Sequence, residues 1–288
     1  MFNYRNNNLL PMKFNKFRKN DTNSVYIFTN ARDEPNIAEW IAHHLLLGFD
    51  KVFVFDHLSK ESIQSKLGTN FNNKVNIRRV DGSGNIKLKL MKEAVEIADK
   101  EEASWMLYLD SDEFLNLNKH KNVKEYLLNF VEADSVGVNW LMFGSSGYVE
   151  QPSGLITENF IRSEIRLNQH VKSFVRPSQV MTVVNPHWFY IQNKNRYYSC
   201  NGTRMAIGPF NNQPLPFIKA SAYIAHYVIQ SEHEYSRRKG RQMDDGSGAR
   251  VIDTSGVNKM YNNVTNNQMQ NKYSKRIKEF LKGYNIVL

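Results

Sequence analysis

The chain has 288 residues, 41% apolar and 23% charged, which is typical of a globular protein with one large α/β domain or two small ones. Its single cysteine excludes an intrachain disulfide, and no apolar run approaches the roughly 18 residues that would cross a bilayer. The net charge of +10 favours anionic partners such as nucleotides, nucleic acid or a membrane surface.

The N-terminal segment is rich in Asn and Lys and shows no periodicity, so we expect a flexible basic arm at residues 1–23. This segment lacks the apolar stretch of a secretory signal. We therefore expect a soluble, cytoplasmic protein, with peripheral membrane association through the basic tails as an alternative. Neither an internal repeat nor a linker follows, so residues 24–288 are expected to form a single domain.

Strands and helices alternate through the first half of this domain. Apolar runs predict buried strands at residues 25–29, 51–56, 75–80 and 105–109. Apolar residues at helical spacing predict one helix between Pro35 and Gly48 and another from Ile86 to about Lys100. This alternation predicts an α/β fold with a mostly parallel sheet and helices on both faces.

The pattern changes after about residue 135. Residues 135–143 indicate a further strand, followed by the loop Gly144-Ser-Ser-Gly147. The stretch 155–198 indicates shorter strands and turns, so a smaller mixed region is expected beside the parallel sheet. Helices are expected at residues 231–241 and near the C-terminus, where apolar residues share one helical face: Tyr273, Ile277, Phe280 and Leu281.

Acidic residues follow the strands of the predicted sheet, at the edge where such sheets bind ligands. Four aspartates fall there: Asp33, Asp56, Asp81 and Asp110. The strongest signal is the triplet Asp110-Ser-Asp112, directly after an apolar strand. Carboxylates this close repel one another unless a cation lies between them, and oxygen ligands suit Mg²⁺ or Mn²⁺. A strand-end turn or a helix N-cap would use the same side chains, and the triplet in isolation leaves both interpretations open.

A set of short motifs occurs in order over roughly residues 25–241. They are Ala31-Arg-Asp-Glu34 with Glu39-Trp-Ile41 and His44, Val54-Phe-Asp56 with Ser59, Trp105 to Phe114, Trp140-Leu-Met-Phe-Gly-Ser-Ser-Gly147, Lys172-Ser-Phe-Val-Arg-Pro177, and His226-Tyr227 with Ser231 and Glu234. Together they resemble the GT-A-fold glycosyltransferases of the family 2-like and family 92 group. The resemblance implies a GT-A-like (Rossmann-like) catalytic domain, with residues 24–134 binding a nucleotide-sugar and residues 135–288 forming the acceptor side and the C-terminal helix.

The resemblance implies donor-binding roles at the ends of the first strands. Ala31, Asp33 and Glu34 would lie near the nucleotide, although Asp33 stands where the family usually has Asn. Asp56 matches an acidic residue that meets the nucleobase or ribose. Asp81, at the carboxyl end of the third strand, joins these donor-site candidates.

The resemblance also implies a metal site for Mn²⁺ or Mg²⁺. Asp110 and Asp112 match the metal-binding acidic motif. His226 matches a histidine that completes the metal shell or contacts the diphosphate. Because His226 lies on an apolar strand, a core histidine is an equally compatible interpretation.

Basic residues are candidates for the diphosphate, because metal and Arg or Lys donors stabilise the charge of a leaving nucleoside diphosphate. The candidates are Lys172 and the cluster Arg237, Arg238, Lys239 and Arg241, of which Lys239 and Arg241 are taken as donor-binding. A solvated helix face explains the same cluster.

An inverting transferase needs a group that takes the acceptor hydroxyl proton. Glu158 is the first candidate for this base, with His187, Asp244 and Asp245 as alternatives, and a surface position would explain Glu158 equally. Trp140, Tyr148 and Trp188 are candidates for stacking on sugar faces or for the core.

The main hypothesis is transfer of a hexose or deoxyhexose from a UDP- or GDP-sugar to a glycan or other hydroxyl acceptor, with inversion favoured by resemblance alone. One alternative is a nucleotidyltransferase that uses the same carboxylates and metal. Another is a basic nucleic-acid-binding protein. Because acidic residues gather at the presumed site and no nucleic-acid-binding motif is present, no nucleic-acid partner is expected.

Overall fold

The structure is a computed structural model that describes residues 23–68, 71–82, 86–211, 215–237 and 254–286. Apart from Asn23, the predicted N-terminal arm lies outside these residues. Within the described part of the chain, no helix combines the length and the apolar character needed to cross a membrane.

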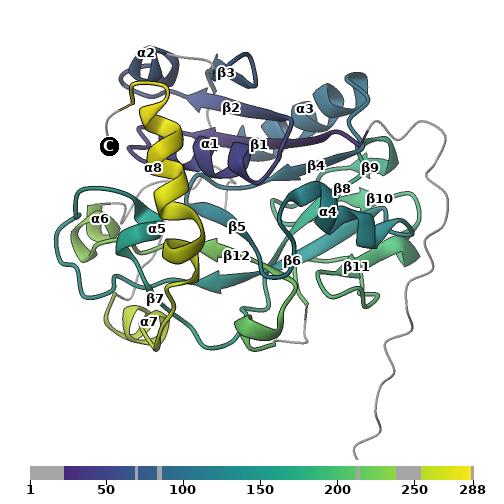
Figure 1. The fold of residues 1–288 in the computed structure, drawn as a ribbon. Coiled ribbons are helices and arrows are strands. Elements are labelled where there is room, and N and C mark those ends of the chain that lie inside the picture. The colour runs from purple at the N-terminus through teal and green to yellow at the C-terminus, as the bar shows by residue number, and fades with distance from the viewer. Residues whose placement is uncertain (1–22, 69–70, 83–85, 212–214, 238–253, 287–288) are drawn as a thin grey trace, which may run out of the picture.

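A nine-stranded sheet forms the centre of the molecule (Figure 1). Four neighbouring strands are mutually parallel, in the order β3 (Val75–Val80), β2 (Lys51–His57), β1 (Val25–Ala31) and β4 (Trp105–Tyr108). These are the four strands that the apolar runs predict, shifted by at most two residues at their ends. Their carboxyl ends therefore share one edge, as predicted.

The sheet continues with strands from both halves of the chain. The antiparallel strand β8 (Val171–Val175) joins β4 to β6 (Ser135–Met142), and β12 (Ala222–His226) runs parallel to β6. At the end of the sheet opposite to β3, β5 (Glu113–Leu117) pairs antiparallel with β12. A short strand, β11 (Tyr197–Ser199), pairs with β6. Five of the eight strand pairings in the sheet are parallel, so the sheet is mostly parallel.

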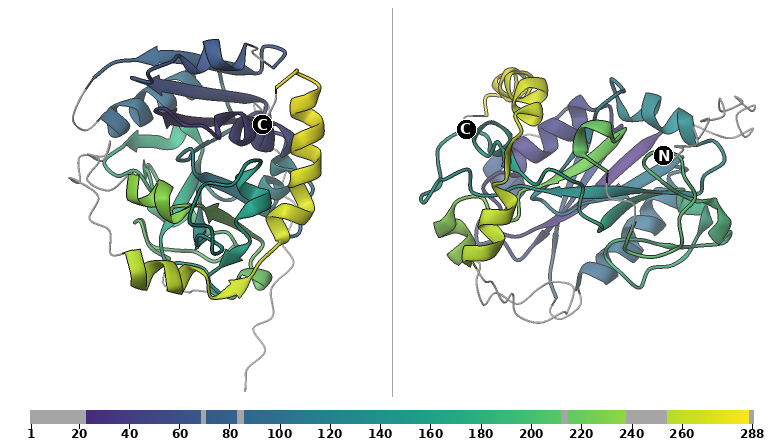
Figure 2. Two further views of the ribbon diagram at one scale, coloured as in Figure 1. Left: turned by 90° about the vertical axis from the view of Figure 1, so that its left-hand side faces the viewer. Right: turned by 90° about the horizontal axis from the view of Figure 1, so that it is seen from below.

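Helices cover both faces of the sheet because the side chains of each strand alternate. On β1, Val25 and Ile27 belong to a core cluster shared with α1 (Ile37–Leu46) and α8 (Lys275–Lys282). Tyr26 and Phe28 belong to a second cluster shared with α3 (Ile86–Lys100). Figure 2 (left) shows α8 and α3 on opposite sides of the sheet.

Short elements complete the fold in both halves of the chain. The helices are α2 (Ile63–Leu67), α4 (Val123–Leu127), α5 (Ile156–Asn159), α6 (Glu232–Arg237) and α7 (Thr254–Tyr261). The strands are β7 (Arg162–Ser163), β9 (Val180–Thr182), β10 (Tyr190–Ile191) and β13 (Val264–Thr265). The helix expected at residues 231–241 is described only as α6, since residues 238–253 lie outside the described residues. A π-helical turn, Gln270–Ser274, precedes α8.

Candidate active site

The triplet Asp110-Ser-Asp112 forms the turn between β4 and β5, at the carboxyl edge of the parallel strands. All four residues of β4 are buried, so the chain leaves the core where the carboxylates begin. The Asp110 backbone N–H donates to Glu113 Oε2 over 2.9 Å, which closes the turn. Because β5 then pairs with β12 in a register that sets Glu113 opposite His226, the turn and the histidine meet.

Two lysines contact the Asp110 carboxylate. Lys87 of α3 forms an ion pair with Oδ1, and Lys172 of β8 donates to Oδ2 over 3.1 Å. Burial raises the pKa of Asp110, but Lys172 and Lys87 outweigh burial and hold that pKa well below its ordinary value. Asp110 is therefore ionised at neutral pH, with both oxygens engaged by cations from distant parts of the chain.

Lys172 is 1% exposed and lies between two carboxylates and a carbonyl. Its Nζ is 3.6 Å from Glu113 Oε2 and donates to the Pro186 carbonyl over 3.2 Å. Burial alone would lower the pKa of Lys172, but Asp110 and Glu113 raise it above its ordinary value. Burial also raises the pKa of Glu113, whose Oε1 has no hydrogen-bond partner among the described residues.

Asp112 and His226 face each other on the opposite side of the turn. His226 Nε2 lies 3.6 Å from Asp112 Oδ1, and the two residues are 5% and 8% exposed. The Asp112 carbonyl accepts the Tyr227 N–H over 2.9 Å, which fixes the turn against β12. Within the described structure, the buried Nδ1 of His226 has no hydrogen-bond partner. His226 is thus a core residue by burial and a candidate ligand by position.

This donor set fits a divalent cation that takes few protein ligands. Asp112 and His226 supply one carboxylate and one imidazole at close range. In the described ranges, no group of three or more His, Cys, Asp or Glu side chains has the geometry to hold a metal ion. Mg²⁺ is often held by one or two carboxylates together with substrate phosphates and water, so two protein ligands are compatible with such a site.

The loop after β1 reaches the acidic turn. Ala31 ends β1 opposite Asp56 of β2. Asp33 adopts a left-handed conformation with φ of 49° and accepts the Lys60 backbone N–H over 2.7 Å. Glu34 Oε2 accepts the hydroxyl of Ser111 over 3.2 Å. The structure therefore brings Glu34 to the predicted metal motif.

The other two donor-site candidates share the same edge. Asp56 is buried, and its Oδ2 accepts the Ile63 backbone N–H over 3.0 Å and Arg79 Nη1 over 3.3 Å. These contacts give Asp56 a structural role at the start of α2, while its Oδ1 has no hydrogen-bond partner in the described structure. Asp81 follows β3 and is exposed.

Arg237 is the described member of the predicted basic cluster. It ends α6 and donates to both oxygens of Glu234, over 2.7 and 2.8 Å. These bonds raise the pKa of Arg237, and the nearby charges of Asp33 and Glu34 raise it further. Arg237 therefore lies close to the loop after β1. Arg238, Lys239 and Arg241 lie outside the described residues.

The candidates for the base are dispersed. Glu158 of α5 forms an ion pair with Lys278 of α8 at 2.7 Å, so its contact is with the C-terminal helix rather than with the acidic turn. His187 lies near the turn, with its ring 5.0 Å from that of Trp140. Burial, followed by the charge of Lys172, lowers the pKa of His187 to about 3, which makes it a poor proton acceptor at neutral pH. Asp244 and Asp245 lie outside the described residues.

Trp140 is the centre of an aromatic and histidine cluster beside Lys172. Its ring lies 4.4 Å from that of His226 and 5.2 Å from that of His170. The buried indole Nε1 has no hydrogen-bond partner among the described residues. Of the other predicted stacking residues, Tyr148 is 39% exposed and Trp188 is buried against Tyr190.

Sequence reasoning missed Lys87 and Glu113 as site residues. A signal existed for Lys87, because a helix that follows a parallel strand starts near the carboxyl edge of the sheet, and Lys87 is the second residue of α3. Glu113 was included only within the motif from Trp105 to Phe114, without a role of its own. Its inward position follows from β5, a reversed strand that no alternation in the sequence predicts.

The α/β domain thus carries an acidic turn, buried lysines and a histidine at its carboxyl edge. The chain belongs to glycosyltransferase family 92, whose family model matches residues 26–282. The strand order and pairings confirm the predicted α/β fold with a mostly parallel sheet.

Relatives in plants carry the same family name. A glycosyltransferase family 92 protein of Oryza sativa subsp. japonica is 23% identical over 230 residues, which cover 77% of this chain and 39% of the relative. One of Arabidopsis thaliana is 23% identical over 234 residues, covering 76% of this chain and 40% of the relative. The chain thus matches about two fifths of the length of these relatives.

Solved structures resemble the chain more remotely. Residues 1–349 of S. aureus TarS align with a TM-score of 0.42 and 14% identity, covering 74% of this chain and 63% of that one. HddC of Yersinia pseudotuberculosis aligns with a TM-score of 0.39 and 10% identity, covering 74% and 96%.

Proposed function

We propose that this chain transfers a sugar from a nucleoside diphosphate sugar to a hydroxyl acceptor, using a divalent cation. The observation that supports this most is the partly buried acidic turn, Asp110 to Asp112, with the buried Lys172 cation beside it at the carboxyl edge of the sheet. Family membership supplies the reaction class, and the residues supply the charges that this reaction needs.

The geometry suits a reaction that creates an anionic leaving group. When the bond from the anomeric carbon to the diphosphate breaks, its electrons stay on the nucleoside diphosphate. Fixed cations at that place lower the barrier, since they need no reorganisation during the reaction. Lys172 is fixed by burial, and the ion pairs of Asp110 keep both Lys172 and Lys87 at the turn.

The cation, Mn²⁺ or Mg²⁺, would be held by Asp112 and His226, with Asp110 as the next candidate, and would supply Lewis-acid stabilisation of the diphosphate. Asp110 differs from Asp112 because lysines occupy both of its oxygens. With two protein ligands available, the cation would need phosphate oxygens of the donor as further ligands. We therefore infer that metal and nucleotide bind cooperatively.

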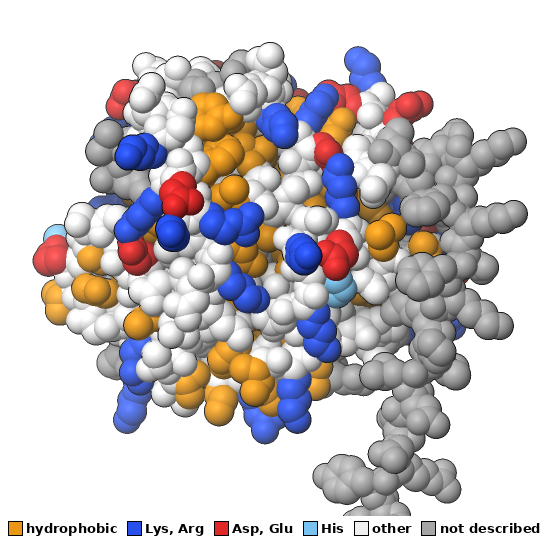
Figure 3. All heavy atoms as spheres, in the orientation of Figure 1, with side chains coloured by type: hydrophobic (Ala, Val, Ile, Leu, Met, Phe, Trp, Pro, Cys, Tyr) orange, Lys and Arg blue, Asp and Glu red, His pale blue; other side chains and the backbone are white. Residues whose placement is uncertain are grey.

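We infer that transfer proceeds with inversion, in a single displacement by an acceptor hydroxyl. The donor is expected to be a UDP- or GDP-hexose and the acceptor a glycan. On the face shown in Figure 3, Lys and Arg side chains are spread among acidic and neutral ones. Among the described residues on this face, the basic side chains form no continuous stripe of the kind that follows a nucleic-acid backbone.

The test is release of nucleoside diphosphate from a panel of UDP- and GDP-hexoses, with Mn²⁺ and free hexoses as acceptors. Wild type is expected to turn over one donor, and Asp112→Ala is expected to lose at least ~100-fold of that rate. Asp99→Ala, at an exposed position of α3, is the matched control. Release of pyrophosphate from nucleoside triphosphates, without turnover of any nucleotide sugar, would instead identify a nucleotidyltransferase.

A further inference from the structure

A short segment after β7 runs beside the end of β6. Ser163 forms an antiparallel bridge with Phe143, and the Glu164 N–H donates to the Met142 carbonyl over 3.0 Å. Further along, the Asn168 N–H donates to the Trp140 carbonyl over 2.8 Å. The segment therefore follows β6 backwards from its carboxyl end, along the edge of β6 opposite to β12.

The register of this pairing sets the direction of the Glu164 side chain. Along a strand, successive side chains point to opposite faces, and paired residues point to the same face. Phe143 packs on Tyr227, whereas Trp140 packs on His226 and under Lys172. Ser163 pairs with Phe143, so Glu164 points to the opposite face, which is the face of Trp140 and of the acidic turn.

The Glu164 carboxylate has an unused oxygen. Its Oε2 is buried and has no hydrogen-bond partner among the described residues, while the residue as a whole is only partly buried. Burial raises the pKa of Glu164 to about 7, against the lowering effect of hydrogen bonds with Met142 and Asn168. A carboxylate with this pKa is a far better proton acceptor than one at the ordinary value of about 4.3.

The segment that carries Glu164 also lies beside the end of α7. The Gly144 N–H donates to the carbonyls of both Arg162 and Tyr261, each over 3.1 Å. Burial, followed by the negative charge of Glu164, raises the pKa of Tyr261 to about 12. Tyr261 ends α7 and packs against Ile229 and Tyr235.

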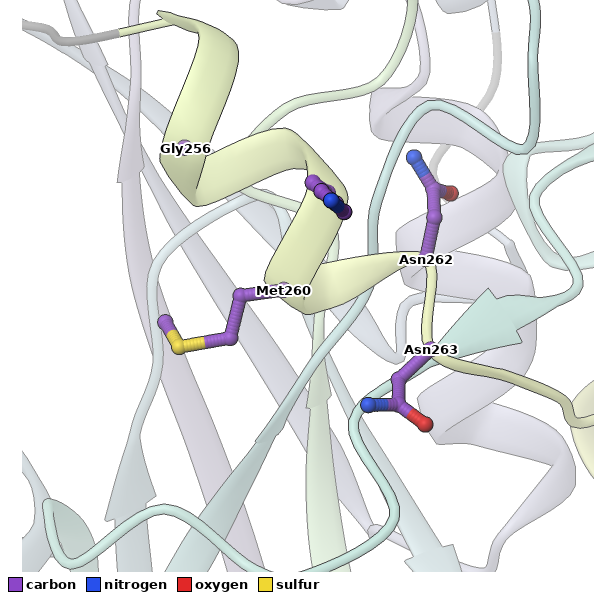
Figure 4. A pocket seen from close by; sticks show the side chains of 5 residues that line it. Gly256, Met260, Asn262 and Asn263 are labelled. Atoms are coloured by element: carbon purple, nitrogen blue, oxygen red, sulfur yellow. The ribbon is translucent and has the colours of Figure 1, made fainter.

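Those two residues line a pocket of about 430 Å³ between α6 and α7, whose other walls are polar: Glu232, Ser236, Asn258, Lys259 and Asn262. A neighbouring pocket of about 530 Å³ is lined by residues that include Met260, Asn262 and Asn263 (Figure 4). Aromatic, hydroxyl and amide groups together suit a sugar.

We propose that Glu164 is the general base that activates the acceptor hydroxyl, with the acceptor sugar held in the pocket between α6 and α7. This inference rests on the proposed sugar transfer. The Glu164 carboxylate takes the proton of the acceptor hydroxyl while the acceptor oxygen bonds to the anomeric carbon. The bond from that carbon to the diphosphate breaks, and its electron pair leaves with the nucleoside diphosphate. Glu164 returns the proton to solvent after product release.

The experiment compares Glu164→Gln, Glu164→Asp and the control Glu279→Gln, at an exposed position of α8, in the same diphosphate-release assay, alongside calorimetric binding of UDP and GDP with Mn²⁺. Loss of the base is expected to lower turnover at saturating donor by ~100-fold or more. Nucleotide affinity should stay within about two-fold of wild type, because Glu164 acts on the acceptor rather than on the donor. Glu164→Asp should retain part of the activity, and Glu279→Gln should retain at least half.

The contrary outcomes separate this inference from the proposed function. Wild-type turnover that persists in Glu164→Gln would overturn the role of Glu164 alone. Loss of nucleotide binding together with turnover, in both the Gln and the Asp variants, would show a structural role and would also overturn it. A wild-type protein that turns over no nucleotide sugar would remove the proposed function and this inference together.

Discussion

Lys172 and Asp110 form a 3.1 Å ion pair that joins β8 to the turn after β4, and the lysine is almost completely buried. The pair links the two halves of the chain, because β4 belongs to the parallel strands of the first half and β8 to the mixed region of the second. This ion pair thus joins the two halves of the chain at the candidate active site.

The first prediction concerns this pair. Lys172→Met should lower the free energy of unfolding by about 3 kcal/mol, because removing one partner leaves Glu113 buried beside Asp110 without the shared cation. Denaturant titration measures the change. Lys275→Met removes a cation from an exposed ion pair on α8 and should leave stability unchanged. A loss below about 1 kcal/mol in Lys172→Met would contradict the structural importance of the pair.

The second prediction concerns pH. His43 is fully buried in α1, with its Nε2–H donating to the Leu115 carbonyl over 2.8 Å. Burial lowers its pKa to about 4, below the unfolded value of about 6.5. The unfolded chain therefore binds a proton that the folded chain does not, and stability falls as pH falls through this window.

Between pH 7 and pH 5, wild type should lose about 2 kcal/mol more stability than His43→Asn, which cannot take up that proton. Denaturant titrations at the two pH values give this difference. His233→Asn, at an exposed histidine whose pKa is raised by Glu150, serves as the control, and it should not reduce the loss of stability toward pH 5. Equal pH dependence of wild type and His43→Asn would mean that His43 titrates normally in the fold.

The third prediction concerns the glycine loop. A Cβ on Gly144 would lie 2.4 Å from Asn262 Oδ1, and that oxygen accepts the Ser146 N–H over 2.8 Å. Gly144→Ala should therefore destabilise the protein by about 2 kcal/mol through overpacking. In an Asn262→Ala background the same change should cost much less, and a double-mutant cycle measures this coupling. Additive effects would show that the loop avoids the clash in another way.

The parallel half of the fold could be predicted from the sequence, because each buried strand is a continuous apolar run and each helix has an apolar face. The acidic turn was predicted for the same reason: the apolar run 105–109 is followed at once by Asp110. The contact of Glu34 with Ser111, beside Asp110, follows from the rule that parallel strands end at one edge.

The ion-pair partners of the charged residues near the acidic turn could not be predicted from the sequence. Lys172 was expected at the diphosphate, but its partner in the fold is Asp110, across an antiparallel pairing that no local pattern specifies. Glu158 was the first candidate for the base, yet Lys278, far along the chain, neutralises it. Glu164 lies in a segment without periodicity, and only its pairing with the end of β6 reveals which face it points to.

The most direct test of the proposed donor site is calorimetric titration of UDP and GDP against wild type and Asp112→Ala, each with Mn²⁺ and with a chelator. Asp112 is 8% exposed and faces His226 at 3.6 Å, so we expect that it would hold the cation. One nucleotide should bind wild type only with Mn²⁺, and Asp112→Ala should lose this binding while Asp99→Ala keeps it. Equal binding by Asp112→Ala, or binding that persists in the chelator, would contradict a metal-dependent donor site at this turn.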